Sequence, residues 1–454
     1  METICFIANF YKTPTFKAVA DQLSSHGVKV CWIVPNRLQY DELIKEYEYE
    51  SVLLLDRSFV DLPNKPIGDF KLNEIIYGDL RVWRHTMVEG LKYLTNIQQP
   101  IWNFIKSNEI HLIFGEDTWA HELLIHRMCN QLKELGCYYY SSMSTRIPNG
   151  KFHFFYDEKQ AECALVNNNH VCPINSVKVE KPYYFAINDK LLKRSMSLSG
   201  NLGRLKRFFT NENIHPTDPC VITNRWIRFK YATKEVINQK MYGLLSRENV
   251  KVIEGKKYVL FGFHKQPEAS IDVCGRYFED QFENVLNIWR QLPNDWYLVI
   301  KEHSNAIGDR SYSFFKRLQK YPRIILINEH TDSLQLLKKC QLVVTNTGTM
   351  ALEAALQGVP SITLSKVVFN NLNYCRHCTW QDLEKYDSLE DLVNEIKSLP
   401  QNSEDYLHFV EKYAFDGYLS NVVTMPNVLN EDNIINIANA FLNLIVYNNK
   451  RLNL

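Results

Sequence analysis

The stretch at residues 343–364, VVTNTGTMALEAALQGVPSITL, restricts the possible fold more than any other part of this chain. A β-branched strand leads into a small polar turn at 346–349, and an alanine- and leucine-rich helix then runs until Gly358 and Pro360 end it. A second apolar strand begins at Ile362. Strand, helix and strand in this order form a βαβ unit, so the stretch predicts a parallel sheet with helices packed on its faces.

The turn at 346–349 opens the helix, and a helix N-terminus carries free N–H donors and a partial positive charge that suit a phosphate or a carboxylate. We therefore expect all four turn residues to bind the phosphate of a nucleotide. They are Asn346, Thr347, Gly348 and Thr349. Glu353 follows about one turn into an otherwise apolar helix and is predicted to accept hydrogen bonds from ribose hydroxyls. The alternative is an ordinary strand-to-helix turn with Glu353 as a solvated helix residue.

Length and charge narrow the class of protein. A chain of 454 residues is too long for one ordinary core, so two α/β domains are expected. The formal net charge is +1, from 52 basic and 51 acidic residues. This balance gives no bulk electrostatic support for a nucleic-acid partner, and none is expected.

The cysteines predict no metal site. Eleven are scattered along the chain, and only Cys375 and Cys378 have the Cys-x-x-Cys spacing, without the second pair that a four-ligand zinc site needs. Free thiols indicate a reducing compartment. The N-terminus has the pattern of a strand rather than of a signal peptide, and no apolar run approaches the ~20 residues of a membrane span, so a cytoplasmic protein is expected.

Strands and helices alternate in two blocks. Strand patterns at 3–9, 28–34, 52–55, 111–114 and 137–140 are separated by helical patterns, and the alternation returns at 257. Between the blocks the pattern loosens into helical pieces at 189–197, 203–210 and 227–246. We expect an acceptor-side Rossmann-like domain with a helical segment at 1–250, a nucleotide-sugar domain at 251–427 and a closing C-terminal helix at 428–454. In such an α/β architecture the ligand cleft lies between the domains, at the carboxyl ends of the strands.

Three loops of the second block follow directly after predicted strands. The first, at 263–270, contains His264, Gln266 and Glu268; the second, at 301–304, contains Lys301 and His303. The third is the 346–349 turn. In a parallel sheet all three open on one edge, and together they suit an anionic nucleotide whose leaving phosphate is stabilised without a metal. Each residue also has a plainer interpretation: His303 as a surface histidine, Lys301 as a strand-end charge and Glu268 as a carboxylate at a helix N-terminus.

The first block contains further candidates on the acceptor side. The sequence GEDT at 115–118 follows a strand and precedes a helix. Glu116 is predicted to deprotonate an acceptor hydroxyl as a general base. Asp117 is predicted either to face the acceptor or to cap the next helix, and capping is favoured. Arg146, in TRIPNG, either binds a sugar carboxylate through two hydrogen bonds or pairs on the surface.

The motifs HKQPEAS, KEHS and TGTMALEAALQGVP resemble those of the bacterial capsule and surface-polysaccharide biosynthesis glycosyltransferases that transfer Kdo and related nonulosonic acids. The resemblance covers about 258–364, and the first half shares only its architecture and the stretches GEDT and TRIPNG. It implies a GT-B fold, with two Rossmann-like doubly wound domains facing a cleft. It also implies a CMP-activated 2-keto sugar acid as donor, no metal, no separate cofactor, and retention of anomeric configuration.

The resemblance also implies roles for single residues. His303 matches the histidine of the family's HP motif and would contact the donor phosphate, although Ser304 stands where the family usually has proline. Glu268 falls where Kdo transferases have an aspartate that is a candidate nucleophile. As a glutamate it is one methylene longer, so it either attacks the anomeric carbon or only stabilises an oxocarbenium-like state.

The predicted function is the transfer of a nonulosonic-type sugar, such as pseudaminic acid or Kdo, from a CMP-activated donor to a capsule or lipopolysaccharide glycan. The expected partners are the sugar nucleotide and a glycan or glycolipid acceptor, with peripheral association with the inner membrane or with capsule assembly machinery. The alternatives are a UDP-sugar-dependent glycosyltransferase or UDP-HexNAc epimerase of the same fold, and a non-catalytic assembly subunit. One fold hosts many chemistries, so the fold does not choose among them.

Overall fold

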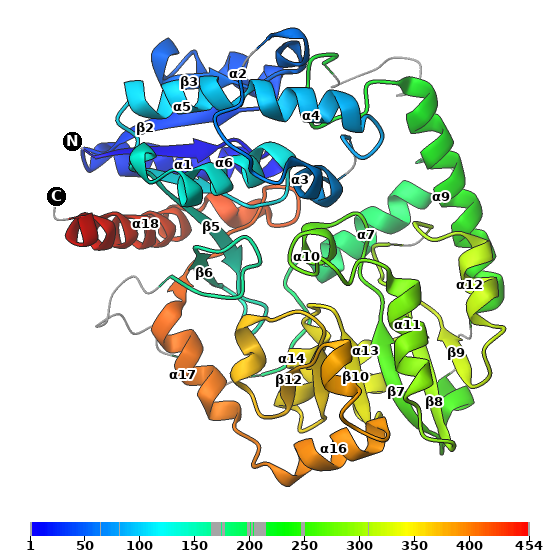
Figure 1. The fold of residues 1–454 in the computed structure, drawn as a ribbon. Helices are drawn as coiled ribbons and strands as arrows, with labels where there is room; N and C mark the ends of the chain where they lie inside the picture. Colours follow the sequence, from blue (N-terminus) through cyan, green and yellow to red (C-terminus); the bar gives the residue numbers. More distant parts are fainter. Residues whose placement is uncertain are drawn as a thin grey trace. The chain divides into compact units, whose positions relative to one another are not determined.

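The computed structural model of the chain describes residues 2–63, 65–80, 82–164, 174, 178–197, 200, 203, 215–246, 250–306 and 308–452 (Figure 1). The chain divides into two compact units. Unit 1 contains Met1–Tyr184, Thr210–Arg225 and Phe409–Leu454, and unit 2 contains Phe185–Phe209 and Trp226–His408. The helix expected at 203–210 lies outside the described residues, apart from Gly203.

Unit 1 is built on a seven-stranded sheet with the order β13-β6-β5-β4-β1-β2-β3. Strands β1 to β5 are parallel, β6 is antiparallel to β5, and β13 is antiparallel to β6. All five residues of β1 are buried, as expected when helices cover both faces of a parallel sheet. The strands are β1 Thr3–Ile7, β2 Lys29–Val34, β3 Val52–Leu54, β4 Leu112–Gly115, β5 Tyr138–Ser144, β6 Lys151–Phe155 and β13 Phe415–Asp416.

Helices connect and cover these strands. They are α1 Thr13–Ser25, α2 Arg37–Leu43, α3 Leu72–Gly78, α4 Met87–Asn96, α5 Gln98–Ser107, α6 Ala120–Gln131 and α18 Glu431–Leu452. Helix α17, Ser403–Tyr413, begins in unit 2 and ends in unit 1. Short 3₁₀ turns across the chain are η1 Phe10–Lys12, η2 Tyr49–Ser51, η3 Arg57–Asp61, η4 Lys133–Leu135, η5 Val250–Ile253, η6 Val368–Asn371 and η7 Pro426–Leu429.

Unit 2 is built on a six-stranded, entirely parallel sheet with the order β12-β11-β10-β7-β8-β9. Its strands are β7 Lys257–Gly262, β8 Trp296–Lys301, β9 Ile324–Ile327, β10 Leu342–Thr345, β11 Ser361–Thr363 and β12 Cys375–His377. Its helices are α7 Phe185–Met196, α9 Arg225–Leu245, α10 Ala269–Asp272, α11 Gln281–Arg290, α12 Tyr312–Leu318, α13 Ser333–Leu337, α14 Met350–Leu356, α15 Trp380–Leu383 and α16 Leu389–Ser398.

Both sheets reverse their strand order at the first strand of the unit. In unit 1, β1 lies between β2 and β4, and in unit 2, β7 lies between β8 and β10. Ligands of open α/β sheets bind at the carboxyl ends of the two strands that flank such a reversal. The predicted pair of doubly wound, Rossmann-like units is confirmed, and the strand order selects two places to search for a site.

The unit boundaries differ from a single division near residue 250. Helix α9 belongs to unit 2 because Tyr242 packs its ring 4.5 Å from that of Phe315 and donates from its hydroxyl to the Ile327 carbonyl (2.6 Å). Residues 409–427 belong to unit 1 because β13 pairs with β6, with Phe415 opposite Phe152. The chain therefore returns to unit 1 before the C-terminal helix begins.

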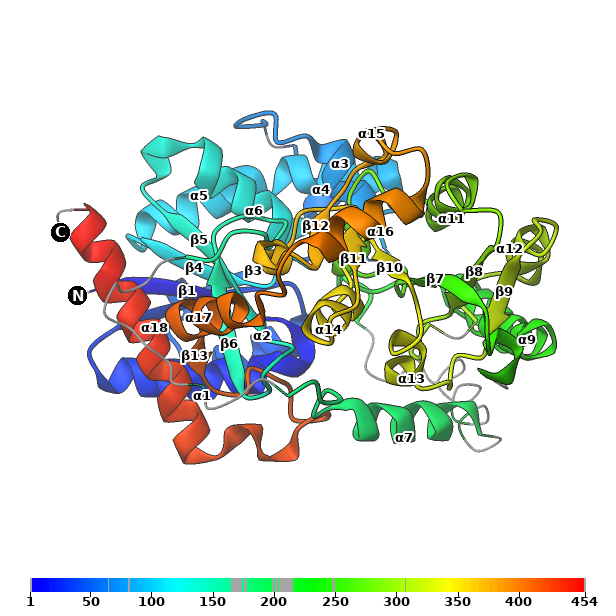
Figure 2. The ribbon, with the colours of Figure 1, turned by 90° about the horizontal axis from the view of Figure 1, so that it is seen from below.

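The C-terminal helix α18 completes the core of unit 1 (Figures 1 and 2). The ring of Phe441 is fully buried and lies 5.5 Å from that of Phe6, 4.7 Å from Phe114 and 4.9 Å from Phe154. These aromatic contacts join the helix to β1, β4 and β6. Within the described residues, no helix has both the length and the hydropathy of a membrane span.

Replacing Phe441 with alanine removes this aromatic contact and leaves a cavity, so Phe441→Ala should lower the free energy of unfolding by about 3–5 kcal/mol. Urea denaturation followed by circular dichroism measures the change. Val446 lies on the same helix and is exposed, so Val446→Ser is the matched control, expected to change stability by less than about 0.5 kcal/mol. Equal stability of Phe441→Ala and the control would contradict this account of the unit 1 core.

Candidate functional site

At the strand reversal of unit 2, a histidine links the ends of β7 and β10. His264 follows β7, and its Nε2 lies 2.9 Å from the Thr345 hydroxyl at the end of β10 and accepts the Thr347 N–H at 3.4 Å. The His264 N–H donates to the side-chain oxygen of Gln281 at 2.7 Å, and this bond fixes the backbone of His264. Burial, aided by the Arg310 cation, lowers the pKa of His264 to about 4, so this imidazole is neutral near pH 7.

The turn after β10 is held from both sides. Thr347 donates from its hydroxyl to the Ser270 carbonyl at 2.7 Å, which ties this turn to the loop after β7. Asn346 is 0% exposed; its amide donates to the Phe278 carbonyl (2.5 Å) and its carbonyl accepts from Asn284 (3.2 Å). Both polar atoms of the Asn346 side chain are therefore used to hold the turn, so the predicted contact of Asn346 with a nucleotide would have to come from its backbone.

The turn presents fewer donors than its sequence predicts. The N–H of Thr347 points to His264, and the N–H of Gly348 donates to the Thr345 hydroxyl at 3.2 Å. Within the described chain this leaves the N–H groups of Thr349 and Met350 without a recorded acceptor, and the Thr349 side chain is exposed. Anion binding by this turn would therefore depend on its second half.

Gly348 is a close-packed position rather than a flexible one. A Cβ at this residue would lie 2.5 Å from Thr345 Oγ1 and 3.4 Å from two ring atoms of His264. The absence of a side chain is what allows the turn to lie against the His264–Thr345 pair. Glu353 lies on α14, where it is buried about one turn from the helix start.

In the loop after β7, Glu268 presents a half-buried carboxylate. The Ser270 hydroxyl donates to Glu268 Oε2 at 3.0 Å, and burial raises the pKa of Glu268. The Glu268 N–H donates to Asp272 at 3.0 Å, and its side chain does not cap α10. Glu268 is the N-cap residue of α10, so its plainer interpretation as a carboxylate at a helix N-terminus agrees with its position, although its side chain makes no capping hydrogen bond.

Gln266 supports this loop. Its amide donates to Asp272 at 2.8 Å, and its side-chain oxygen accepts from Gln281 at 3.1 Å. Both ends of the side chain are engaged within the loop network. The structure therefore places Gln266 as a residue that positions Glu268.

The loop after β8 presents His303 as a neutral hydrogen-bond donor. Its Nδ1 accepts the Asn305 N–H at 3.1 Å, which leaves the proton of the neutral ring on Nε2. Burial, together with the nearby Lys301 and Lys265 cations, lowers the pKa of His303 to about 3. No described residue hydrogen-bonds to Nε2, so this donor can serve a ligand oxygen.

The ammonium of Lys301 contacts the protein backbone rather than facing a ligand site as predicted. Its buried ammonium donates to the Glu329 carbonyl at 2.9 Å and lies 3.5 Å from the Glu302 carbonyl oxygen. Burial lowers the pKa of Lys301 to about 8. The prediction that Lys301 binds the nucleotide is therefore wrong in this structure, because the ammonium instead joins the loops after β8 and β9.

A buried ion pair that the sequence did not reveal connects the two histidines. Arg310 lies 2.5 Å from Glu302 and donates to the His264 carbonyl at 2.6 Å, while the same Glu302 oxygen accepts the His303 N–H at 2.8 Å. Glu302 lies within the KEHS motif at 301–304, and its place in that motif was the one feature of the sequence that could have indicated its role. Lys265 was also missed, although it is the residue between His264 and Gln266.

Together these contacts bring the three predicted loops of unit 2 into one network. Thr347 and Ser270 join the loops after β10 and β7, and Arg310 joins the loops after β8 and β7. The network positions two neutral imidazoles and a carboxylate at one sheet edge. Such preorganised polar groups stabilise charge that develops during a reaction.

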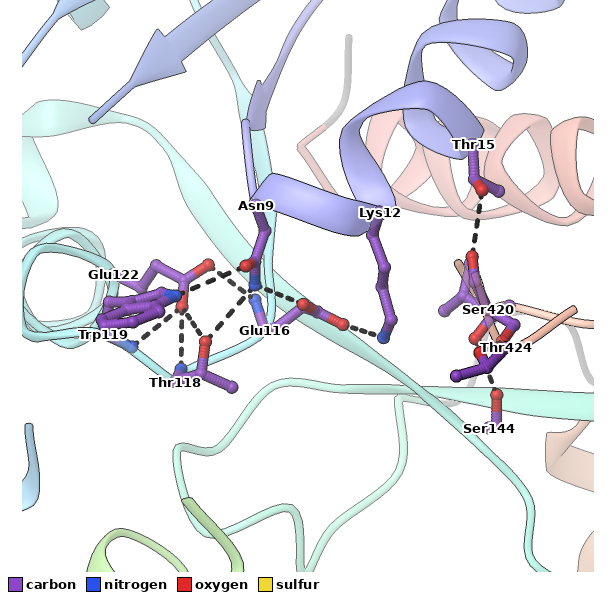
Figure 3. A network of polar contacts seen from close by, with 11 residues as sticks. Asn9, Lys12, Thr15, Glu116, Thr118, Trp119, Glu122, Ser144, Ser420 and Thr424 are labelled. Carbon is purple, nitrogen blue, oxygen red and sulfur yellow. Dashed lines mark hydrogen bonds and ion pairs between the residues drawn. The ribbon is translucent and has the colours of Figure 1, made fainter. Parts of the chain in front are cut away.

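Figure 3 shows the corresponding strand reversal of unit 1. Glu116 follows β4, and its carboxylate accepts from both Lys12 and Asn9, which follow β1. Trp119 donates from its indole N–H to the Asn9 side-chain oxygen at 3.3 Å. Glu116 is thus placed at the predicted edge, and its two partners could not be predicted because they lie more than a hundred positions away in the chain.

Glu122 organises the loop that carries Glu116. Its carboxylate accepts the N–H groups of Glu116 (3.2 Å), Thr118 (2.7 Å) and Trp119 (3.1 Å), and also the Thr118 hydroxyl (2.9 Å). Burial raises the pKa of Glu122 to about 7, and the Thr118 donors oppose this rise. A carboxylate in the first turn of α6 thus reaches back to fix the loop.

Asp117 neither caps α6 nor reaches an acceptor. It is 1% exposed and lies 2.9 Å from His126 Nδ1, and Trp119 is the N-cap residue of the helix. His126 Nε2 donates to the Tyr156 carbonyl at 3.1 Å, so both ring nitrogens are donors. Burial alone would lower the pKa of His126, but Asp117 outweighs it and raises this pKa to about 9. Both predictions for Asp117 are wrong, because a buried ion pair uses its carboxylate.

Arg146 lies in the connection at 145–150 between β5 and β6, beside the carboxyl end of β5. Since β5 is the parallel neighbour of β4, this connection opens on the same edge as Glu116. Arg146 is half-buried. Among the residues that the structure describes, no three histidine, cysteine, aspartate or glutamate side chains form a group that could hold a metal ion.

Comparison with known proteins identifies the segment that contains the unit 2 network. Residues 255–377 match the family described as capsule polysaccharide biosynthesis protein. This segment is therefore similar to capsule polysaccharide biosynthesis proteins. The predicted resemblance over 258–364 is confirmed, and the matched segment spans all six strands of the parallel sheet.

The solved structures that are similar to this chain belong to proteins with different activities. KpsC of Thermosulfurimonas dismutans, a beta Kdo 2,7 transferase, is 11% identical, with 76% of this chain and 90% of that chain covered and a TM-score of 0.31. The UDP-GlcNAc 2-epimerase of Neisseria meningitidis is 13% identical, with 90% of this chain and 99% of that chain covered and a TM-score of 0.28. MnaA of S. aureus with UDP is 13% identical, covers 98% of each chain, and has a TM-score of 0.29.

TM-scores this low do not establish a shared fold, so the fold assignment rests on the strand orders of the two sheets. Among curated proteins, none matches this chain.

The close packing at Gly348 gives a test of the network. Gly348→Ala should lower the free energy of unfolding by about 1–3 kcal/mol, because the new methyl group would overlap Thr345 Oγ1. Thr345→Ala removes that oxygen, so the cost of Gly348→Ala should be smaller in the Thr345→Ala background. A double-mutant cycle by chemical denaturation measures this coupling. Additive costs would show that the turn does not pack on Thr345 as described.

Proposed function

We propose that this chain is a glycosyltransferase that moves a nonulosonic-type sugar, Kdo or pseudaminic acid, from a CMP-activated donor to a capsule or lipopolysaccharide glycan. The observation that carries the proposal is the loop network of unit 2, which lies wholly within the segment that matches the capsule polysaccharide biosynthesis family. It surrounds the strand reversal where α/β sheets bind nucleotides. The same network would serve any nucleotide sugar, so the identity of the donor is the finer part of the proposal.

In this proposal the leaving phosphate is stabilised by fixed donors and by one cation. His303 donates its Nε2–H, Thr349 supplies its hydroxyl and N–H, and the charge of Lys265 adds to them. Glu353 on α14 accepts hydrogen bonds from the ribose hydroxyls. The transfer requires no metal in this proposal, so a chelator should leave it unchanged. His264 acts as a positioning residue, because its ring nitrogen Nε2 is used within the loop network.

Glu268 carries the chemistry at the anomeric carbon. For retention through a covalent intermediate, a Glu268 oxygen bonds to the anomeric carbon while the bond from that carbon to the phosphate oxygen breaks and CMP leaves. An acceptor hydroxyl then displaces Glu268 and gives its proton to a base. The raised pKa of Glu268 suits a nucleophile, because a more basic carboxylate is the stronger one. The alternative is that Glu268 only stabilises an oxocarbenium-like state.

Glu116 is the proposed base for the acceptor hydroxyl. Lys12 and Asn9 hold its carboxylate in a fixed orientation, which a positioned proton acceptor needs. Arg146 is proposed to bind the carboxylate of a sugar acid through two hydrogen bonds. The proposed partners are therefore a nucleotide sugar and a glycan or glycolipid, for a protein placed in the cytoplasm.

The donor is tested by offering CMP-Kdo, CMP-pseudaminate and a UDP-hexose with a capsule-type glycan acceptor, and measuring release of the nucleotide. We expect acceptor-dependent CMP release. A thermal-shift comparison supports it: CMP at a hundred times its Kd stabilises the folded protein by about 2.7 kcal/mol, while UDP should shift the midpoint less. Turnover of the UDP-hexose alone would overturn the CMP assignment, and epimerisation of a UDP-sugar without acceptor would replace transfer with epimerisation.

Glu268→Gln should reduce kcat at least about a thousandfold, because the amide neither attacks nor carries negative charge. The CMP-induced thermal shift should persist, since the phosphate donors are unchanged. Glu283→Gln, the same chemical change at an exposed glutamate of α11, should leave kcat unchanged. Full polysaccharide production with Glu268→Gln would instead favour a non-catalytic assembly subunit. A mass increase equal to one sugar on Glu268 of the wild type, without acceptor, would identify the covalent route.

A further inference from the structure

Helix α9 has one face anchored in unit 2. Asn238 donates to the Gly308 carbonyl at 2.9 Å, and Tyr242 donates to the Ile327 carbonyl at 2.6 Å. Figures 1 and 2 both show the helix beside α12 and β9, on the outer side of the unit. These contacts fix which side of the helix faces the unit and which side faces outward.

The outward side carries a row of exposed apolar side chains. Trp226 is 64% exposed, Phe229 42%, Ile237 55% and Leu244 78%. At 100° per residue, Trp226, Ile237 and Leu244 fall within about 20° of one another around the helix axis, and the row is about 27 Å long. Single exposed apolar residues are ordinary, but four large ones on one side of a single helix, two of them aromatic, indicate an interaction surface.

The same side is basic. Lys230, Lys234 and Lys240 are exposed next to the apolar row, and from Trp226 to Leu245 the helix carries four cations and one carboxylate, Glu235. The resulting charge of +3 on this short segment contrasts with +1 for the whole chain. Positive charge beside an exposed apolar row complements a surface that is both anionic and apolar underneath.

We propose that α9 docks on an anionic lipid bilayer. The helix lies parallel to the membrane, Ile237 and Leu244 enter the boundary between headgroups and acyl chains, and the three lysines lie at the level of the lipid phosphates. Interfacial helices combine these features: an apolar row that includes tryptophan or phenylalanine, flanked by lysine or arginine. A nucleic acid would match the charge but would leave the aliphatic side chains in water, so the bilayer is the better fit.

The experiment is co-sedimentation of the full chain with vesicles made of equal parts phosphatidylglycerol and phosphatidylcholine, and with vesicles of phosphatidylcholine alone. We expect binding to the anionic vesicles that weakens as salt is added. Changing Lys230, Lys234 and Lys240 together to Gln should weaken the binding about 100-fold. Changing Ile237 and Leu244 to Ser should weaken it by about 10-fold or more.

Matched control variants show whether a loss of binding comes from the α9 surface itself or only from the change in net charge or in apolar content. Lys338, Lys339 and Lys397 are also exposed on unit 2, and changing all three to Gln makes the same change in net charge without touching α9. Changing the exposed Val88 and Val446 to Ser is the control for the apolar row. Both control variants should bind as the wild type does, and all variants should keep the wild-type circular dichroism spectrum.

Three results would overturn the proposal. They are no binding to either vesicle, equal loss of binding in the α9 and control variants, and a concentration-dependent dimer that the Ile237 and Leu244 changes abolish. The last result would make the row a contact between two copies of the chain. Because the assay contains no sugar nucleotide, its outcome is independent of the proposed transferase activity.

Discussion

The contact between His264 and Thr345 is the constraint on which the unit 2 site depends. It joins the two strands on either side of the reversal in strand order, and it is possible only because Gly348 leaves room for it. From His264 the network continues through its carbonyl to Arg310, then to Glu302 and the backbone of His303. The imidazole of His303, which is proposed to contact the donor phosphate, is thus positioned by residues that have no such proposed contact. A geometry fixed before binding costs little entropy when the ligand arrives, which is the condition for effective charge stabilisation.

Both units place candidate residues at the same topological position, but with different chemistry. Unit 2 presents neutral imidazoles beside half-buried Glu268, whereas unit 1 presents Glu116 held by a lysine and an asparagine. Neutral donors can stabilise a leaving phosphate without binding the ground state as strongly as several cations would. A carboxylate whose orientation is fixed by neighbouring donors suits the role of a positioned proton acceptor. This difference in chemistry matches the proposed donor role of unit 2 and the proposed acceptor role of unit 1.

Much of the fold could be predicted from the sequence, whereas less of the candidate site could be predicted. The alternation of strands and helices predicted both Rossmann-like units, because parallel strands need crossovers and have buried faces. The loops after β7, β8 and β10 were located for the same reason. What the pattern could not show was which polar side chains turn inward. Asn346 and Lys301 were predicted to contact a ligand, yet both hold loops together, and Asp117 pairs with His126. Such assignments depend on partners distant in sequence, as with Lys12 and Glu116, and no local spacing encodes them.

The packing of α18 on β1 and β4 has a consequence for biosynthesis. Phe6 and Phe114 precede unit 2 in the chain, whereas Phe441, which covers both rings, follows it. At about 5–20 residues per second, the interval between Phe114 and Phe441 is on the order of tens of seconds. All residues of unit 2 are made within that interval, because its last segment ends at His408. The half of the protein that is translated first is therefore the half whose core is completed last, and its exposed aromatic residues are the part most in need of a chaperone.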